Sequence, residues 1–428
     1  MTLQIALVCC LALLTSAYVA ARKDQSPHLP MLEAAWLHSS VTWPVVVKAA
    51  LGSFIFSADA DSGTSYLLVT YGPALLMSVV LMIVRVRGDA KLFSPSVWIF
   101  VSVALSVPFI VFSASSGVAG ILPTLLILPA LFQRASPIPM AAWFRSARTS
   151  LLVVVMAITG TALVAPINII GLCRLDKCSA FGEVLTSPIT NNGNFAGVAI
   201  ALLLPLALLG LQRFPMILTA AAALIMIEAS GSRSAAISAW VVSAVILLAS
   251  KNWQRRAWMP MFAFGCVVAA SVVTAVGTFP REFATYRGGL WARAQELFLQ
   301  QPILGHGPGF WSSQPAEMSF LANYSPHNFW LEFAVSGGIV AMICVIAAGV
   351  ALLRRTGKQE RYAVLMMFIA ILALGVVEAP IQTAKLGLAP FAHLLPLIIG
   401  ASCAVASRSA QKPSQAKALP LGKALTRH

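Results

Sequence analysis

The chain has 428 residues, of which 59% are hydrophobic and 10% are charged, and its mean hydropathy is +0.84. A soluble domain carries roughly a quarter charged residues, so this composition excludes an ordinary soluble protein and predicts an integral membrane protein. The net charge of +15 would also suit a nucleic-acid-binding protein, but no Lys/Arg run is interleaved with aromatic residues. Basic loops that orient a membrane protein and contact anionic lipid explain the charge better. We therefore expect membrane lipids, and no nucleic acid, as partners.

Apolar segments about 16 to 25 residues long recur along the chain, which is the length of a membrane-crossing helix. They lack the strict alternation of an outer-membrane barrel. They predict an all-α, polytopic bundle of about 12 or 13 transmembrane helices in one domain, residues 1–407, followed by a basic, disordered tail, residues 408–428. The segment at 43–57 carries Lys48 and is either a span or a re-entrant piece. The candidate spans are 2–21, 43–57, 66–84, 96–115, 117–133, 150–172, 194–212, 215–229, 234–250, 257–279, 328–352, 361–380 and 386–406.

The positive-inside rule orients these spans. If the basic tail is cytoplasmic, alternation places most of the 29 Lys and Arg residues on the cytoplasmic side. The loops at 173–193 and 280–327, and the turn at Arg233, then face the opposite side. Soluble activated sugars and ATP are scarce on that side, so a transferase there would need a donor delivered by the membrane.

Two of the seven cysteines lie outside the apolar segments. Cys173 and Cys178 flank the polar turn CRLDKC. If this loop is extracytoplasmic, a local disulfide and two free thiols are both open alternatives. A zinc site would need more ligands than the loop offers.

Arg233 lies in the sequence EASGSRSAA, between two apolar segments. A cation at the mouth of a membrane helix needs hydration, snorkelling or a partner. Glu228 is five residues back, which is far for an ideal helical pair. The glycine and serines around Arg233 suit phosphate oxygens, so the residue is either an interface anchor or part of an anion site.

Arg287 opens the sequence RGGLWARAQELFLQQPILGHGPG, part of the only long span, residues 281–338, that contains several arginines, histidines and carboxylates together. Its first part has the spacing of an amphipathic helix, with Trp291 at a membrane-interface position. Arg287 precedes the first turn and predicts an anion site there, while Arg293 projects from the helix body. A purely structural interface helix is the alternative. The predicted apolar face comprises Leu290, Ala294, Leu297 and Phe298.

His327 stands between Pro326 and Asn328, just before the next span. An imidazole at the membrane edge suits a general base or a donor to an acceptor hydroxyl. Glu332, one to two turns into the following helix, could orient His327 or could be a buried, protonated carboxyl. Asn194 begins another span, where Asn first suggests a helix cap.

Other polar residues give weaker signals. Glu378 is intramembrane, and Lys385 is its expected partner. His306 lies in a glycine turn with no obvious partner. Asp59 and Asp61 form an Asp-X-Asp sequence that is more simply a polar turn than a metal site. We therefore predict no metal site and no cofactor.

These pieces, in their order and spacing, resemble the bacterial O-antigen ligase and polymerase superfamily over about residues 185–345. The matching sequences are TNNGNFAGVAIALLLP, the turn GSRSA, YRGGLWARAQELFLQQPILGHGPG and HNFWLEFAVSGGIVA. One departure is Val335, two residues before Gly337, where the family often has an acidic residue.

The resemblance implies a GT-C-like glycosyltransferase of the inner membrane, with a long periplasmic loop and a cytoplasmic C-terminus. The donor would be a saccharide on undecaprenyl pyrophosphate, and transfer would be metal-independent. The family's essential arginines carry over to Arg233 and Arg287, and its essential histidine to His327. Asn328, Arg293, Glu332 and Asn194 are the supporting candidates.

The expected reaction is a one-step, inverting transfer to an acceptor hydroxyl. O-antigen ligase activity on lipid A–core is the first hypothesis, and polymerisation of O-antigen or exopolysaccharide repeat units is the close alternative. These motifs do not separate either one from glycosylation of a protein. A transporter or flippase of an anionic, lipid-linked substrate is a third reading from another class. A transporter should place charges near mid-bilayer in paired halves, whereas these arginines cluster at one face.

Overall fold

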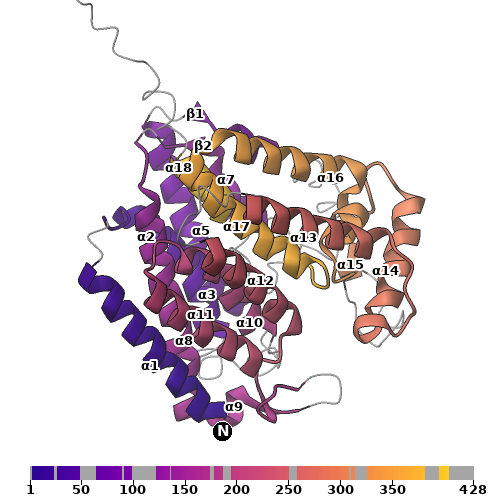
Figure 1. Ribbon diagram of the computed structural model, residues 1–428. Coiled ribbons are helices and arrows are strands. Elements are labelled where there is room, and N and C mark those ends of the chain that lie inside the picture. Colours follow the sequence, from indigo (N-terminus) through magenta and orange to yellow (C-terminus); the bar gives the residue numbers. More distant parts are fainter. Residues whose placement is uncertain are drawn as a thin grey trace, which may run out of the picture.

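The computed structural model describes residues 2–23, 27–48, 64–88, 91–98, 122–134, 136–173, 178–186, 194–249, 258–307, 310–313, 325–380 and 395–403. Helices dominate these residues, as predicted, and the strands among them form two short antiparallel ribbons, β1–β2 and β3–β4 (Figure 1). The first half contains α1 (Thr2–Lys23), α2 (Met31–Leu37), the π-helix η1 (His38–Thr42), α3 (Trp43–Val46), α5 (Thr64–Arg87), β1 (Lys91–Leu92), α7 (Leu122–Leu131), β2 (Phe132–Gln133), α8 (Met140–Val164), α9 (Pro166–Ile169), β3 (Ile170–Leu172) and β4 (Glu183–Leu185). The second half contains α10 (Asn194–Leu208), α11 (Arg213–Ala229), α12 (Arg233–Ala249), α13 (Trp258–Val276), α14 (Phe283–Gln300), α15 (Phe310–Ser313), α16 (Phe329–Arg355), α17 (Lys358–Gly375) and α18 (Leu395–Cys403).

Two helices form the centre of the bundle. Helix α10 packs against α8, α11, α12 and α17, and its side chains from Phe195 to Leu208 are buried on every face. Helix α17 is buried almost as completely from Ala363 to Gly375. A helix that is apolar all round cannot face water, so these two helices lie inside.

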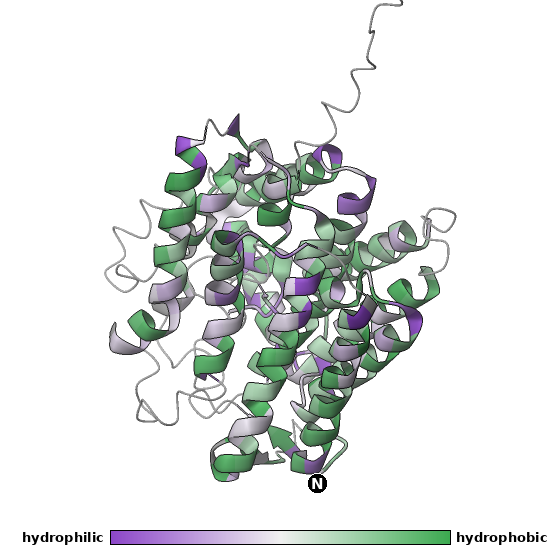
Figure 2. Ribbon diagram, turned by 90° about the vertical axis from the view of Figure 1, so that its left-hand side faces the viewer, coloured by the Kyte–Doolittle hydropathy of each residue, from purple (hydrophilic) through white to green (hydrophobic). Residues whose placement is uncertain are grey.

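Other helices expose apolar side chains that only lipid would cover. Exposed large hydrophobic residues include Leu11 of α1, Leu76 of α5 and Phe262 of α13. Figure 2 shows that hydrophobic residues dominate the helices. Within the described residues, five helices are long and apolar enough to cross a membrane: α1, α5, α8, α13 and α16. Helices α10 and α12 are apolar but shorter. The chain is therefore an all-α, multi-pass membrane protein, while the predicted number of spans stays a prediction because several candidates extend beyond the described residues.

The span expected at 150–172 is displaced in the structure. Helix α8 begins ten residues earlier, at Met140, and ends at Val164. Pro166 explains the early end, because a proline disfavours helical backbone in the residue before it, and Ala165 has φ −139°. Residues 170–172 form β3 instead.

Helices α16 and α17 form a long antiparallel hairpin that positions the site. The 27 residues of α16 include a kink at Gly338, and their summed rise of about 40 Å at 1.5 Å per residue exceeds the roughly 30 Å of bilayer hydrocarbon. After two intervening residues α17 begins, and it runs antiparallel to α16. The residues just before α16 and just after α17 therefore lie at the same end of the bundle.

Candidate functional site

One buried carboxylate, Glu378, connects three of the predicted site residues. Its Oε1 accepts from Nη2 of Arg287 at 2.6 Å and from Nδ2 of Asn194 at 3.2 Å. Its Oε2 lies 2.7 Å from Nδ1 of His327. The side chain of Glu378 is 2% exposed, whereas those of Arg287 and His327 are 21% and 22% exposed. The carboxylate is thus buried, while the arginine and the histidine that contact it remain partly accessible to solvent or to a substrate.

Sequence reasoning missed the partners that the structure gives Glu378. The expected partner, Lys385, lies outside the described residues, and the carboxylate contacts Arg287 and His327. These partners are 91 and 51 residues away in the chain. An intramembrane acid is by default a candidate functional residue, and that signal could have identified it.

Asn328 fixes His327 next to Glu378. Its Oδ1 accepts from the backbone N–H groups of Trp330 and Leu331, which caps α16. Its Nδ2 donates to Oγ1 of Thr274 at 3.0 Å and to the carbonyl oxygen of Val376 at 3.2 Å. Asn328 is fully buried, so it ties the start of α16 to the turn that carries Glu378.

Left-handed backbone occurs on both sides of this carboxylate. His327 has φ +49°, and Ala284, Thr285 and Tyr286 have φ values from +50° to +67°. Such conformations cost roughly 1–3 kcal/mol per non-glycine residue and collect at functional sites. The three-residue turn separates Phe283 from the regular part of α14. Arg287 therefore stands at the start of that helix, as predicted, and its Nη1 donates to the Ala284 carbonyl at 3.2 Å.

Arg233 lies beside the first turn of α10, the turn that carries Asn194. A Cβ at Gly197 would lie 2.6 Å from Oγ of Ser230 and 2.6 Å from Cβ of Ser232, so the α11–α12 turn packs directly on α10. Arg233 follows Ser232 and is exposed. Within the described residues its guanidinium makes no ion pair, and Glu228 instead accepts from the backbone N–H of Ala180 at 3.0 Å.

The remaining candidates lie apart from Glu378 or have other contacts. Arg293 pairs with Glu296 at 3.3 Å on the exposed side of α14. Glu332 is buried in α16, while the carboxylate that contacts Nδ1 of His327 is that of Glu378. Trp291 is not at an exposed interface position: it is 1% exposed and packs with Ala275 and other residues of α13, α14 and α16. The buried face of α14 comprises Gly288, Trp291, Ala294 and Leu297.

The two glycine motifs dock against each other. The backbone N–H of His306 donates to the carbonyl of Val335 at 2.7 Å, and that of Ile339 donates to Pro302 at 2.9 Å. Gly305 and Gly338 have φ +66° and +61°, and a Cβ on either would collide with backbone atoms of the other segment. The glycines are therefore structural, and they join the loop after α14 to a kink in α16. His306 has a partner after all, because its Nε2 lies 2.7 Å from the Leu297 carbonyl oxygen.

Cys173 and Cys178 form a disulfide. The segment after Cys178 lies at the Arg233 end of the bundle, because the backbone N–H of Ala180 donates to Glu228 at the end of α11. The same segment carries Glu183, which accepts from the backbone N–H of Thr2 at 3.4 Å. The start of α1 therefore also lies at this end.

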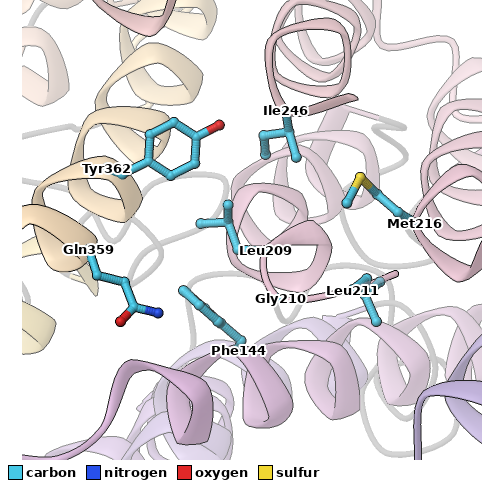
Figure 3. Close-up of a pocket in the computed structure, with 8 residues that line it drawn as sticks. All are labelled: Phe144, Leu209, Gly210, Leu211, Met216, Ile246, Gln359 and Tyr362. Atoms are coloured by element: carbon cyan, nitrogen blue, oxygen red, sulfur yellow. The ribbon is translucent and has the colours of Figure 1, made fainter. Parts of the chain in front are cut away.

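A cavity of about 270 Å³ lies at the opposite end of the bundle (Figure 3). Gln359 and Tyr362 line it from the start of α17, and Phe144 lines it from the start of α8. The Glu378 cluster is near the other end of α17, so this cavity is no part of the candidate site. Asp59 and Asp61 lie outside the described residues.

These features define a multi-pass, α-helical membrane protein with a histidine and an arginine joined by a carboxylate at one end of the bundle. Residues 216–346 match the family model of O-antigen ligase. The match confirms, over this segment, the resemblance to the O-antigen ligase and polymerase superfamily. The matched segment contains Arg233, Arg287 and His327, whereas Asn194 and Glu378 lie outside it. No curated protein matches the chain.

Proposed function

We propose that the chain transfers a saccharide from undecaprenyl pyrophosphate to an acceptor hydroxyl at the periplasmic face of the inner membrane. The observation that carries this proposal is the bridge from Arg287 through Glu378 to His327. It joins a phosphate-binding group and a proton-accepting group through one buried carboxylate. Both are partly exposed, so a donor and an acceptor can reach them together.

Arg287 and Arg233 would bind the pyrophosphate. A guanidinium binds phosphate oxygens through paired, charge-assisted hydrogen bonds. Pyrophosphate is already a good leaving group, so the site needs to stabilise negative charge rather than donate a proton. Cations fixed before reaction in a site of low dielectric supply that stabilisation. Because Glu378 holds Nη2 of Arg287, and Ala284 holds Nη1, this guanidinium is fixed in advance.

His327 would accept the proton of the incoming hydroxyl. With its Nδ1 directed at Glu378, the ring turns Nε2 away from the carboxylate. The acceptor oxygen attacks the anomeric carbon while the bond from that carbon to the phosphate oxygen breaks. The bonding electrons leave with the undecaprenyl pyrophosphate, and the hydroxyl proton passes to Nε2. A single displacement of this kind inverts the anomeric configuration, through an oxocarbenium-like transition state.

The Cys173–Cys178 disulfide supports the periplasmic location. Disulfides persist in oxidising compartments and are rare in the cytosol. The bonded loop lies at the same end of the bundle as Glu228 and the turn before Arg233. The positive-inside distribution of basic residues favours the same orientation.

Ligation to lipid A–core is the proposed acceptor reaction, because the His327–Asn328 pair resembles the ligase type. Deletion of the gene distinguishes it from polymerisation. Lipid A that carries no O-antigen at all, with long chains still made on undecaprenyl pyrophosphate, is the result expected for a ligase. Lipid A capped with single repeats would identify a polymerase.

His327→Ala tests the enzyme directly. The purified variant should lose transfer from a lipid-linked donor while it inserts and unfolds like the wild type. His28→Ala, an exposed histidine before α2, is the matched control and should transfer normally. Retained activity in His327→Ala would end the proposed role of the base. Addition of EDTA should leave transfer intact, because the proposed charge stabilisation comes from arginines.

The same assay separates an enzyme from a flippase. Wild-type protein in detergent has no gradient and no second compartment, so consumption of the donor there is expected only of an enzyme. A protein that moves the lipid between leaflets of a vesicle but leaves the saccharide attached would be a transporter.

A further inference from the structure

A buried lysine, Lys48, lies among three aromatic rings. Its Nζ is 4.9 Å from the ring centroid of Phe195, 5.5 Å from that of Tyr71 and 5.9 Å from that of Tyr66. Lys48 is 7% exposed, and Tyr66 and Tyr71 are buried in the first turns of α5. The resemblance to the ligase superfamily assigned no role to this lysine, which lies well before the matched residues.

The first turn of α10 connects Lys48 to the candidate site. Asn194 donates to Glu378, the carboxylate that holds Arg287 and His327. Phe195, the next residue, forms one side of the aromatic enclosure of Lys48. Gly197, half a turn on, packs on Ser230 and Ser232, next to Arg233. One helical turn thus contacts the carboxylate that holds Arg287, and it also contacts the segments that carry Lys48 and Arg233.

The aromatic rings offer the Lys48 ammonium a favourable surrounding inside the protein. Ring faces attract an ammonium through their quadrupole. An ionisable residue inside a membrane segment is costly and is usually found on a substrate or ion pathway. Lysine also binds phosphate as a compact charge with three N–H donors. A pyrophosphate carries more negative charge than one arginine can neutralise, so a further fixed cation beside it would neutralise part of the remaining charge.

We propose that Lys48 is a third cation of the donor site and binds a phosphate of the lipid-linked pyrophosphate. Arg287 and Arg233 approach from the second half of the chain, and Lys48 approaches from the first half across the turn of α10. This inference rests on the proposed function, because it names a further contact of the same donor. A purely structural role, in which the enclosure only joins α5 to α10, is the competing explanation.

The test measures binding of undecaprenyl pyrophosphate, without any saccharide, to the full-length purified protein in nanodiscs, with undecaprenyl monophosphate as a second probe. In Lys48→Met the affinity for the pyrophosphate should fall about 10- to 100-fold, the effect of one charge-assisted hydrogen bond. Lys48→Arg should stay within a few-fold of the wild type. The control is Lys358→Met, an exposed lysine at the start of α17, and it should bind normally. In transfer assays Lys48→Met should raise the donor KM more than the acceptor KM.

The outcomes separate the two proposals. If wild-type protein shows no preference for undecaprenyl pyrophosphate over the monophosphate, the proposed function fails. If wild-type protein binds and Lys48→Met binds equally well, only the role of Lys48 is overturned, and a lower melting temperature with unchanged affinity would assign it to structure. If Lys48→Met does not fold, the same binding measurement on Phe195→Leu tests the role of Lys48. This variant should keep the helical content but bind at least threefold more weakly, and unchanged affinity would overturn the inference.

Discussion

Glu378 and His327 are 51 residues apart, yet Oε2 of the carboxylate lies 2.7 Å from Nδ1 of the imidazole. The α16–α17 hairpin brings them together, since His327 precedes α16 and Glu378 follows α17. Asn328, next to His327, also joins the two segments, because its Nδ2 donates to the carbonyl oxygen of Val376 just before Glu378. The contact orients the ring of the proposed base and places negative charge between it and Arg287.

Glu378→Gln should therefore damage both activity and stability. The amide keeps the size of the side chain but removes the charge that orients His327 and pairs with Arg287. We expect kcat to fall about 100-fold, the lower end of what a positioned proton-transfer group contributes. Loss of a buried ionic partner should destabilise the fold by about 3 kcal/mol. Transfer kinetics and thermal unfolding measure the two effects.

Glu296→Gln is the matched control, because Glu296 is 65% exposed and pairs only at the surface with Arg293. It should change stability by less than about 0.5 kcal/mol and leave transfer unchanged. A Glu378→Gln variant with wild-type kcat would show that the carboxylate does not orient the base.

The two proposed donor-binding arginines should differ in their effect on stability. Arg287→Ala leaves the buried Glu378 without one of its ionic partners, so it should lower the melting temperature as well as donor affinity. Arg233 is exposed and makes no ion pair within the described residues. Arg233→Ala should therefore raise the donor KM at least tenfold, equivalent to about 1.4 kcal/mol, while it unfolds at the wild-type temperature. Donor titrations and thermal unfolding, with exposed Arg354→Ala as the control, measure this difference; equal loss of stability in both variants would contradict it.

The docking of the two glycine motifs predicts a large effect on folding. Gly305→Ala and Gly338→Ala each place a methyl group in left-handed backbone and against backbone atoms of the other segment. The backbone conformation alone costs roughly 1–3 kcal/mol, and the clash adds to it. Gly265→Ala in α13 is the control, because a Cβ there meets nothing within 4 Å. Thermal unfolding should show a clear loss for the first two variants and none for the third; normal unfolding of Gly338→Ala would contradict the docking.

The disulfide offers a test of orientation. A variant that keeps Cys173 and Cys178 and has the other five cysteines replaced should resist a membrane-impermeant maleimide in intact cells. After mild reduction it should react, because the loop is proposed to face the periplasm. A single cysteine at position 358, the start of α17, should stay unlabelled in intact cells. Labelling only in lysed cells would place the loop in the cytosol and remove the proposed access to a lipid-linked donor.

Some features of this protein follow from local sequence. Apolar segments about as long as the bilayer hydrocarbon is thick predicted the helices, because an unpaired backbone is too costly in hydrocarbon. The amphipathic helix after Arg287 was also predicted, although its buried face was shifted toward Trp291. The motif residues Arg233, Arg287 and His327 were identified because few polar residues interrupt the apolar sequence.

The tertiary structure alone decided which of these polar residues meet. Sequence proximity suggested Glu332 for His327 and Lys385, which lies outside the described residues, for Glu378. The hairpin joins Glu378 to His327 and Arg287, two contacts that sequence proximity did not suggest. The sequence by itself thus determined that charged residues stand at helix ends, since burial of a charge in lipid is unfavourable. The partner of each charge depends on which helix ends pack together, and that is set by contacts between helices far apart in the chain.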